Sequence, residues 1–174
     1  MEALLEEYYK TDPVLERFHN RKIFLDEASY QLNGVTQSGK TKLIKSYLST
    51  LKKNTYIYID CEDVRIDFDV MNTLLPRFCI ENKITTLAFD NYNSNAKIFN
   101  IKQLIIASQK HYELDFLETI QVYPLDFEEF LAYEHKFDSS ALNHYLKLGG
   151  LAVMHKVASD ERNLFLQRVL KHSL

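Results

Sequence analysis

The stretch Gly34-Val35-Thr36-Gln37-Ser38-Gly39-Lys40-Thr41 decides the fold, because G-x-x-x-x-G-K-[ST] is the spacing of a phosphate-binding loop. It uses two of only four glycines in the chain, and glycine gives such a loop its backbone freedom. Backbone N–H groups are then expected to face phosphate oxygens, with Lys40 reaching the β- and γ-phosphates and the Thr41 hydroxyl binding Mg²⁺. The alternative is an ordinary glycine turn before a helix. The predicted nucleotide-binding residues are Gly34, Val35, Thr36, Gln37, Ser38, Gly39, Lys40, Thr41 and Lys42.

The residues on either side of the motif favour the phosphate-binding loop. The extended run 30–33 leads into Gly34, and apolar residues recur at helical spacing over 43–51. A strand before the glycine loop and a helix after it form the structural context in which this motif binds phosphate. Residues 22–25 are a candidate neighbouring strand. Further strands are predicted over 55–60, 84–90, 102–108 and 119–123, with a helix over 67–81 that Pro76 kinks or divides.

Three regions follow from this alternation. Residues 1–20 form an N-terminal helical segment, 21–125 a parallel α/β core of the P-loop NTPase type, and 126–174 a small helical extension. The extension is predicted to hold helices over 126–133, 139–148 and 158–172. Its last helix runs to Leu174 without a C-cap signal, which suggests the front part of a longer protein. The aromatic residues Phe127, Phe130 and Tyr133 are expected to pack on the sheet, or else to meet a protein partner or a second copy.

The second half of a nucleotide site is predicted at the end of the strand over 84–90. Asp90 follows apolar strand residues, and there its carboxylate would hold Mg²⁺ together with Thr41. The alternative is an Asp that caps the next turn. Asn91 comes next, and an amide can orient a water molecule but cannot accept its proton, so hydrolysis is predicted to be slow.

Two other polar residues are candidates for the catalytic set of Lys40, Asn91, Glu62 and Ser108. Glu62 follows the strand over 55–60 and would approach the γ-phosphate if that strand neighbours the Asp90 strand. The alternative for Glu62 is a solvated acidic loop. Ser108, with Gln109, ends the strand over 102–108 and is a candidate γ-phosphate sensor. The alternative for Ser108 is a helix cap or turn serine.

Composition sets the class of protein. The 174 residues are 46% hydrophobic with a net charge of −3, which is typical of one globular domain and gives no indication of nucleic-acid binding. The acidic amphipathic start is unlike a signal peptide, and no apolar run is long enough to span a membrane, so a cytoplasmic protein is expected. Cys61 and Cys79 fit reduced thiols, and the histidines show no zinc-binding spacing.

Segments that occur in order along residues 20–155 resemble the prokaryotic AAA-type P-loop ATPases that carry a C-terminal domain of unknown function. Besides the loop and Leu87-Ala88-Phe89-Asp90, the more specific segments are Tyr123-Pro124-Leu125-Asp126-Phe127-Glu128-Glu129-Phe130-Leu131 and Leu148-Gly149-Gly150. The resemblance implies ATP as ligand, a five-stranded sheet in the order 5-1-4-3-2 and a helical lid after the fifth strand.

The chain departs from that family at three places. Asn91 stands where the family usually has Glu. Leu117-Glu118-Thr119 replaces a Gly-Arg pair that would supply an arginine, and Arg162 is the best substitute among only six arginines. The resemblance covers only the part of that family that precedes its C-terminal domain. The expected function is therefore a slow or partner-dependent ATPase that acts as a nucleotide switch. A nucleotide-binding scaffold without catalysis is the alternative, and a small-molecule phosphotransferase is the third.

Overall fold

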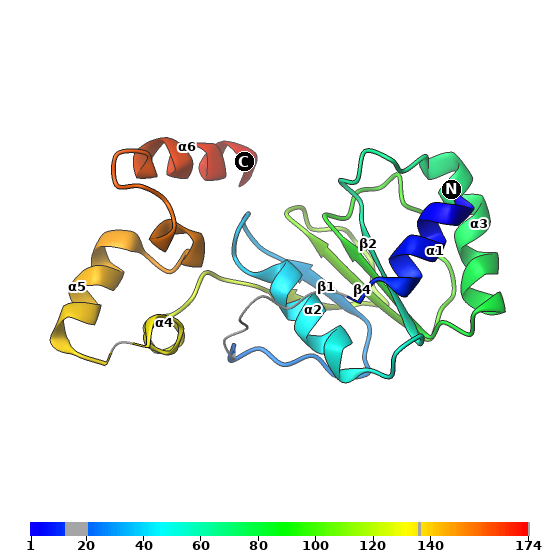
Figure 1. The fold of residues 1–174 in the computed structure, drawn as a ribbon, viewed down its shortest axis with the longest axis horizontal. Helices are drawn as coiled ribbons and strands as arrows, with labels where there is room; N and C mark the ends of the chain where they lie inside the picture. Colours follow the sequence, from blue (N-terminus) through cyan, green and yellow to red (C-terminus); the bar gives the residue numbers. More distant parts are fainter. Residues whose placement is uncertain (13–20, 136, 174) are drawn as a thin grey trace.

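A five-stranded parallel β-sheet lies at the centre of the computed structural model, which describes residues 1–12, 21–135 and 137–173 (Figure 1). All four strand pairings are parallel and the strand order is β2-β3-β4-β1-β5, which is the expected order 5-1-4-3-2. The carboxyl ends of all five strands therefore share one edge of the sheet. The strands are β1 (Tyr30–Asn33), β2 (Tyr56–Asp60), β3 (Thr86–Asp90), β4 (Gln103–Ser108) and β5 (Glu118–Gln121).

Alternate residues of the central strands belong to two separate hydrophobic cores, because successive side chains of a strand point to opposite faces of the sheet. Leu87 and Phe89 of β3 belong to one core, and Ala88 between them belongs to the other. All of β3 and β4 is buried, which is why these strands read as continuous apolar runs in the sequence.

Helices cover both faces of the sheet. Helices α1 (Glu2–Lys10) and α3 (Phe68–Glu81) cover the first face, where Leu5 of α1 is fully buried. Helix α2 (Lys40–Thr50) covers the second through Leu43, Ile44 and Leu48. Helix α3 continues unbroken through Pro76. The predicted N-terminal segment extends over residues 13–20, which lie outside the described residues.

The helical extension, residues 126–173, lies to one side of the sheet (Figure 1). Asp126 caps its first helix and forms a capping box with Glu129, which explains why the helix starts there. The elements are α4 (Phe127–Glu134), α5 (Ser139–Leu148), the 3₁₀ helix η1 (Ala152–His155) and α6 (Arg162–Ser173). Within the described residues, no helix combines the length and apolar character needed to cross a membrane.

Two local expectations are wrong. Residues 22–25 form no strand; Lys22 instead pairs with Asp126 and Glu128 at the start of α4, and Phe24 is 81% exposed. The α4 aromatic rings pack within the helical extension and not on the sheet: the centroid of the Phe130 ring lies 5.1 Å from that of Tyr145 on α5. Both differences arise because residues 21–22 and α5 provide contacts that local patterns do not reveal.

Candidate nucleotide-binding site

The loop between β1 and α2 packs tightly against the segment after β5. A β-carbon at Gly34 would lie 2.2 Å from the Val122 carbonyl oxygen, so this position excludes any side chain. Gly39, the residue before α2, has a φ of 102°, which is readily adopted only by glycine. Both glycines of the motif are thus required by the backbone path.

Lys40 folds back over the loop. Its Nζ donates hydrogen bonds to the carbonyl oxygens of Gly34 at 2.7 Å and Val35 at 2.9 Å. Burial lowers the pKa of Lys40, and the nearby charge of Asp90 acts in the opposite direction. A cation is therefore held at the centre of the loop in a position where an anion would relieve the cost of its desolvation.

Buried polar atoms without partners gather at this loop. The hydroxyl oxygens of Thr36 and Ser38 are buried and, within the described part of the chain, have no hydrogen-bond partner. No side chain caps the start of α2 either, although the first N–H groups of a helix lack partners in their own helix. Buried polar atoms without partners are rare in folded proteins, and here they gather where the motif predicts phosphate.

A cavity of about 470 Å³ opens beside the loop, between the sheet and the helical extension. Four of its lining side chains are cationic and one, Glu62, is acidic, so the cavity favours an anion. The core contributes Arg21, Thr36, Gln37, Ser38, Gly39, Lys40, Thr41, Lys42, Glu62, Asn91 and Gln109; the extension and the segment before it contribute Leu125, Tyr133, Ala152, Val153 and Lys156.

Asp90 is positioned at the end of β3 by Tyr58 of the neighbouring β2. The Tyr58 hydroxyl donates to Asp90 Oδ2 at 2.7 Å, and the Asn91 N–H donates to Oδ1 at 3.0 Å. Burial and the Asp90 charge raise the pKa of Tyr58, so it remains a donor. The described residues contain no cluster of three or more acidic, His or Cys side chains that could hold a metal. Thr41 and Asp90 suit Mg²⁺, which usually takes one or two protein ligands together with phosphates and water.

Asn91 has a structural reason of its own to be asparagine. Its φ is 48°, in the left-handed region that Asn tolerates better than most residues. Its Nδ2 donates to Asp60 Oδ1 at 2.9 Å, which ties the ends of β2 and β3 together. Asn91 lines the cavity, as does Glu62, although Glu62 is also solvent-exposed.

Of the pair Ser108-Gln109, only Gln109 reaches the cavity. Ser108 ends β4 between β1 and β3 as expected, but its hydroxyl is buried and bonded to the Lys110 carbonyl oxygen. Ser108 is therefore better explained as a turn serine. Gln109 also borders a smaller cavity of about 160 Å³, where His111 Nδ1 lies 2.8 Å from the side-chain amide nitrogens of Gln31 and Asn33.

The arginine at the site is Arg21, which sequence reasoning missed. Arg162 instead bonds the Val157 carbonyl oxygen and is not among the cavity-lining residues. Arg21 is 8% exposed, and its three partners lie far from it in the sequence, at separations of 17, 102 and 108 positions. No local pattern could have revealed these contacts; the only available signal was the scarcity of arginine.

The site combines a glycine loop, a desolvated lysine, unpaired donors and a carboxylate at the neighbouring strand end. Together these groups offer what a chain of phosphates with Mg²⁺ requires: hydrogen-bond donors, positive charge and a metal-binding oxygen. Comparison with known proteins gives no further assignment, since no protein-family model matches the sequence and no curated protein matches it.

Proposed function

We propose that this chain binds Mg-ATP through the loop 34–42 and is a P-loop nucleotide-binding protein of the AAA type. The observation that carries the proposal is Lys40, which is desolvated and, among the described residues, is bonded only to loop carbonyls, beside hydroxyls that have no partner there. A triphosphate supplies the anionic partner for these groups. Thr41 and Asp90 would hold Mg²⁺, which would neutralise phosphate charge.

The same residues suggest how the loop would act on a triphosphate. Lys40 would exchange its two carbonyl acceptors for β- and γ-phosphate oxygens. The Thr36 and Ser38 hydroxyls and the N–H groups at the start of α2 would supply further hydrogen bonds. Gln109 and Asn91, which line the cavity from neighbouring strand ends, would orient a water molecule. Glu62 is the carboxylate of the cavity lining that could accept its proton.

We infer slow hydrolysis, because the residue after Asp90 is an amide that Asp60 already engages. This supports a nucleotide switch that turns over slowly or with a partner. The same observation favours the alternative, a nucleotide-binding scaffold without catalysis. A phosphotransferase is less supported, since such enzymes gather several arginines around phosphate. Among the described residues that line this cavity, Arg21 is the only arginine.

The binding test compares Lys40→Ala with Lys52→Ala in titrations with a fluorescent ATP analogue and Mg²⁺. Lys52 is an exposed lysine after α2 and serves as a matched control. Loss of a charged donor costs about 1.5–3 kcal/mol, so the Lys40→Ala Kd should rise about 10- to 150-fold, with Lys52→Ala unchanged. Equal affinities for the two variants would refute the assignment of the loop.

The hydrolysis test measures steady-state phosphate release. Turnover that depends on Lys40 supports the ATPase and excludes the scaffold. Glu62→Gln should then reduce turnover while leaving Mg-ATP affinity within about twofold, because Glu62 is exposed and would act on water rather than on the nucleotide. Undiminished turnover in Glu62→Gln would remove this residue from the catalytic set.

A further inference from the structure

Arg21 joins three segments that are distant in the sequence. Its Nη1 donates to the Ser38 carbonyl oxygen in the loop at 2.8 Å, and its Nη2 donates to the Tyr123 carbonyl oxygen after β5, also at 2.8 Å. Its Nε donates to Glu129 Oε1 on α4 at 2.9 Å. Both members of the Arg21–Glu129 ion pair are over 90% buried. The guanidinium group therefore connects the phosphate-binding loop directly to the helical extension.

The contact with Ser38 fixes the orientation of a peptide in the loop. A trans peptide directs its C=O and its N–H to opposite sides, so the bond from Arg21 turns the Gly39 N–H away from Arg21. A β-carbon at Gly39 would lie 2.9 Å from Arg21 Nη1, which shows how closely the guanidinium packs on the loop backbone. Arg21 thus sets the direction of an N–H at the start of α2.

Glu129 in turn holds Arg21 in place. Glu129 Oε1 also accepts the Lys22 N–H at 2.8 Å, and Oε2 accepts the Asp126 N–H at 3.1 Å. Burial alone would raise the pKa of Glu129, but the hydrogen bonds from Lys22 and Arg21 outweigh it and the pKa is lowered. The carboxylate therefore remains charged at neutral pH, as its role as the partner of Arg21 requires.

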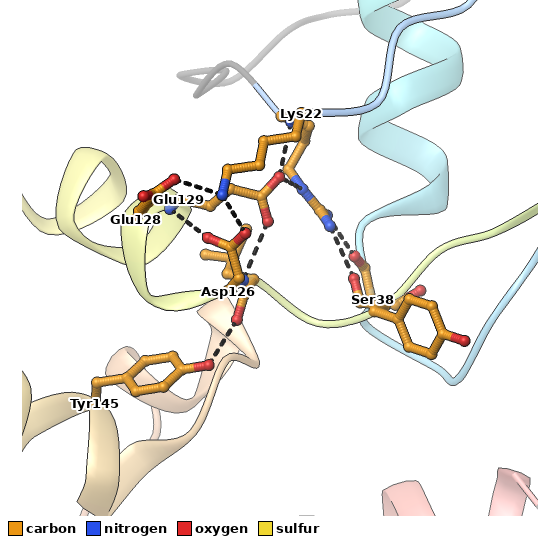
Figure 2. A network of polar contacts seen from close by, with 9 residues as sticks. Lys22, Ser38, Asp126, Glu128, Glu129 and Tyr145 are labelled. Atoms are coloured by element: carbon orange, nitrogen blue, oxygen red, sulfur yellow. Dashed lines mark hydrogen bonds and ion pairs between the residues drawn. The ribbon is translucent and has the colours of Figure 1, made fainter.

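A second, exposed contact also links residues 21–22 to the start of α4. Lys22 Nζ pairs with Asp126 at 2.6 Å and with Glu128 at 2.5 Å, both at the start of α4 (Figure 2). Figure 2 shows this network of polar contacts, with Glu128 and Glu129 of α4 at one end and Ser38 of the loop at the other. Exposed pairs of this kind contribute little, so the buried pair dominates the connection between the loop and the extension.

We propose that Arg21 is a positioning residue, held by Glu129, through which the helical extension sets the phosphate affinity of the loop. This inference rests on the proposed function, and the ligand it concerns is the phosphate chain of a nucleoside triphosphate. Because linkage is reciprocal, a triphosphate in the loop strengthens the docking of α4 by the same factor by which docked α4 strengthens binding.

The test compares Glu129→Gln with Glu128→Gln in titrations with a fluorescent ATP analogue and Mg²⁺. The control is the same substitution one residue away, at an exposed glutamate that touches Lys22 but has no bond to Arg21 among the described contacts. Glu129→Gln removes the charge that holds Arg21 and should raise the Kd about tenfold. Glu128→Gln should leave it within about twofold.

A readout on the wild type keeps the proposal testable if Glu129→Gln does not fold. Amide hydrogen exchange of residues 127–134 should slow at saturating Mg-ATP. Arg21→Lys should lose that slowing, since the single ammonium nitrogen of lysine does not reproduce the planar fork whose three nitrogens bond Glu129, Ser38 and Tyr123. Because Tyr133 of α4 also lines the cavity, slowing in the wild type is expected from direct contact as well. Loss of the slowing in Arg21→Lys while Mg-ATP is still bound is the result that a purely structural role would not produce.

Each outcome decides between the two proposals. Failure of the wild type to bind Mg-ATP overturns both the proposed function and this inference. Normal binding with unaltered exchange in α4, or with equal Kd values for Glu129→Gln and Glu128→Gln, overturns this inference alone. A tenfold difference in Kd together with nucleotide-dependent protection of α4 supports it.

Discussion

Replacement of Gly34 by alanine tests the close approach on which the loop depends. The new β-carbon would lie 2.2 Å from the Val122 carbonyl oxygen and 2.9 Å from Ser38 Oγ. Since the first neighbour is backbone, the loop and the segment after β5 must separate. That movement breaks the hydrogen bond from the Val122 N–H to the Asn33 carbonyl oxygen, which is 2.6 Å long.

The size of the effect follows from these contacts. Overpacking costs about 1–3 kcal/mol and the lost hydrogen bond about 0.5–1.5 kcal/mol. The free energy of unfolding should therefore fall by roughly 2–4 kcal/mol. At about 2–4 °C per kcal/mol for a chain of this size, the Tm should fall by roughly 5–15 °C.

The assay is urea denaturation followed by circular dichroism, with Gly149→Ala as the comparison. Gly149 has a φ of 68° but no atom within 4 Å of its β-carbon position, so its replacement introduces only backbone strain. With a ψ of −173°, this conformation is essentially restricted to glycine and its strain costs about 1–3 kcal/mol, against roughly 2–4 kcal/mol for Gly34→Ala. If Gly34→Ala unfolds within about 0.5 kcal/mol of the wild type, the close-approach argument is wrong.

Three further substitutions test the polar framework of the site. Tyr58→Phe removes the donor to the buried Asp90 carboxylate and should cost about 1.5–3 kcal/mol; an unchanged urea midpoint would contradict this. Asn91→Asp would set a second carboxylate against Asp60, at the place of a 2.9 Å hydrogen bond. It should destabilise the fold by about 1–3 kcal/mol at pH 7 and by less near pH 4, where one carboxyl is protonated; a pH-independent cost would refute the charge argument. Burial lowers the pKa of Lys40 below its usual 10.5, so the folded state binds fewer protons than the unfolded state between these two values. The stability of the wild type relative to Lys40→Met should therefore rise with pH up to about 10.5, and a difference that falls over this range would contradict the buried-cation description.

More of the fold than of the site could be predicted from the sequence. The strands over 55–60, 84–90 and 102–108 were recognisable because buried parallel strands are short apolar runs. The order of the sheet came from the resemblance and is confirmed. The predicted strand ends differ from the observed ones by at most two residues, as at β5 (Glu118–Gln121), where weak burial leaves little pattern to read, and the last helix begins four residues later than predicted.

The site could be predicted only where its residues are adjacent in the sequence. The loop residues follow one another, and Asp90 follows a recognisable strand. Arg21 depends on Glu129, which is 108 positions away, so no local pattern links the two. The end of the strand over 102–108 predicts the pair Ser108-Gln109 as a sensor, yet only Gln109 lines the cavity, because the Ser108 hydroxyl turns to the Lys110 carbonyl oxygen. Tertiary contacts determine which of these side chains reach the site, and a local sequence pattern does not reveal those contacts.

The position of α1 has a practical consequence for anyone who shortens the chain. Division of the sequence by motif places the start of the α/β core at residue 21, yet Leu5 is fully buried in the core that β2 shares with α3. Helix α1 also packs along β2, which is an edge strand of the sheet. A version that starts at residue 21 would expose that edge and its apolar neighbours, and an exposed sheet edge is a template for aggregation. Expression and crystallisation should therefore keep the first twelve residues.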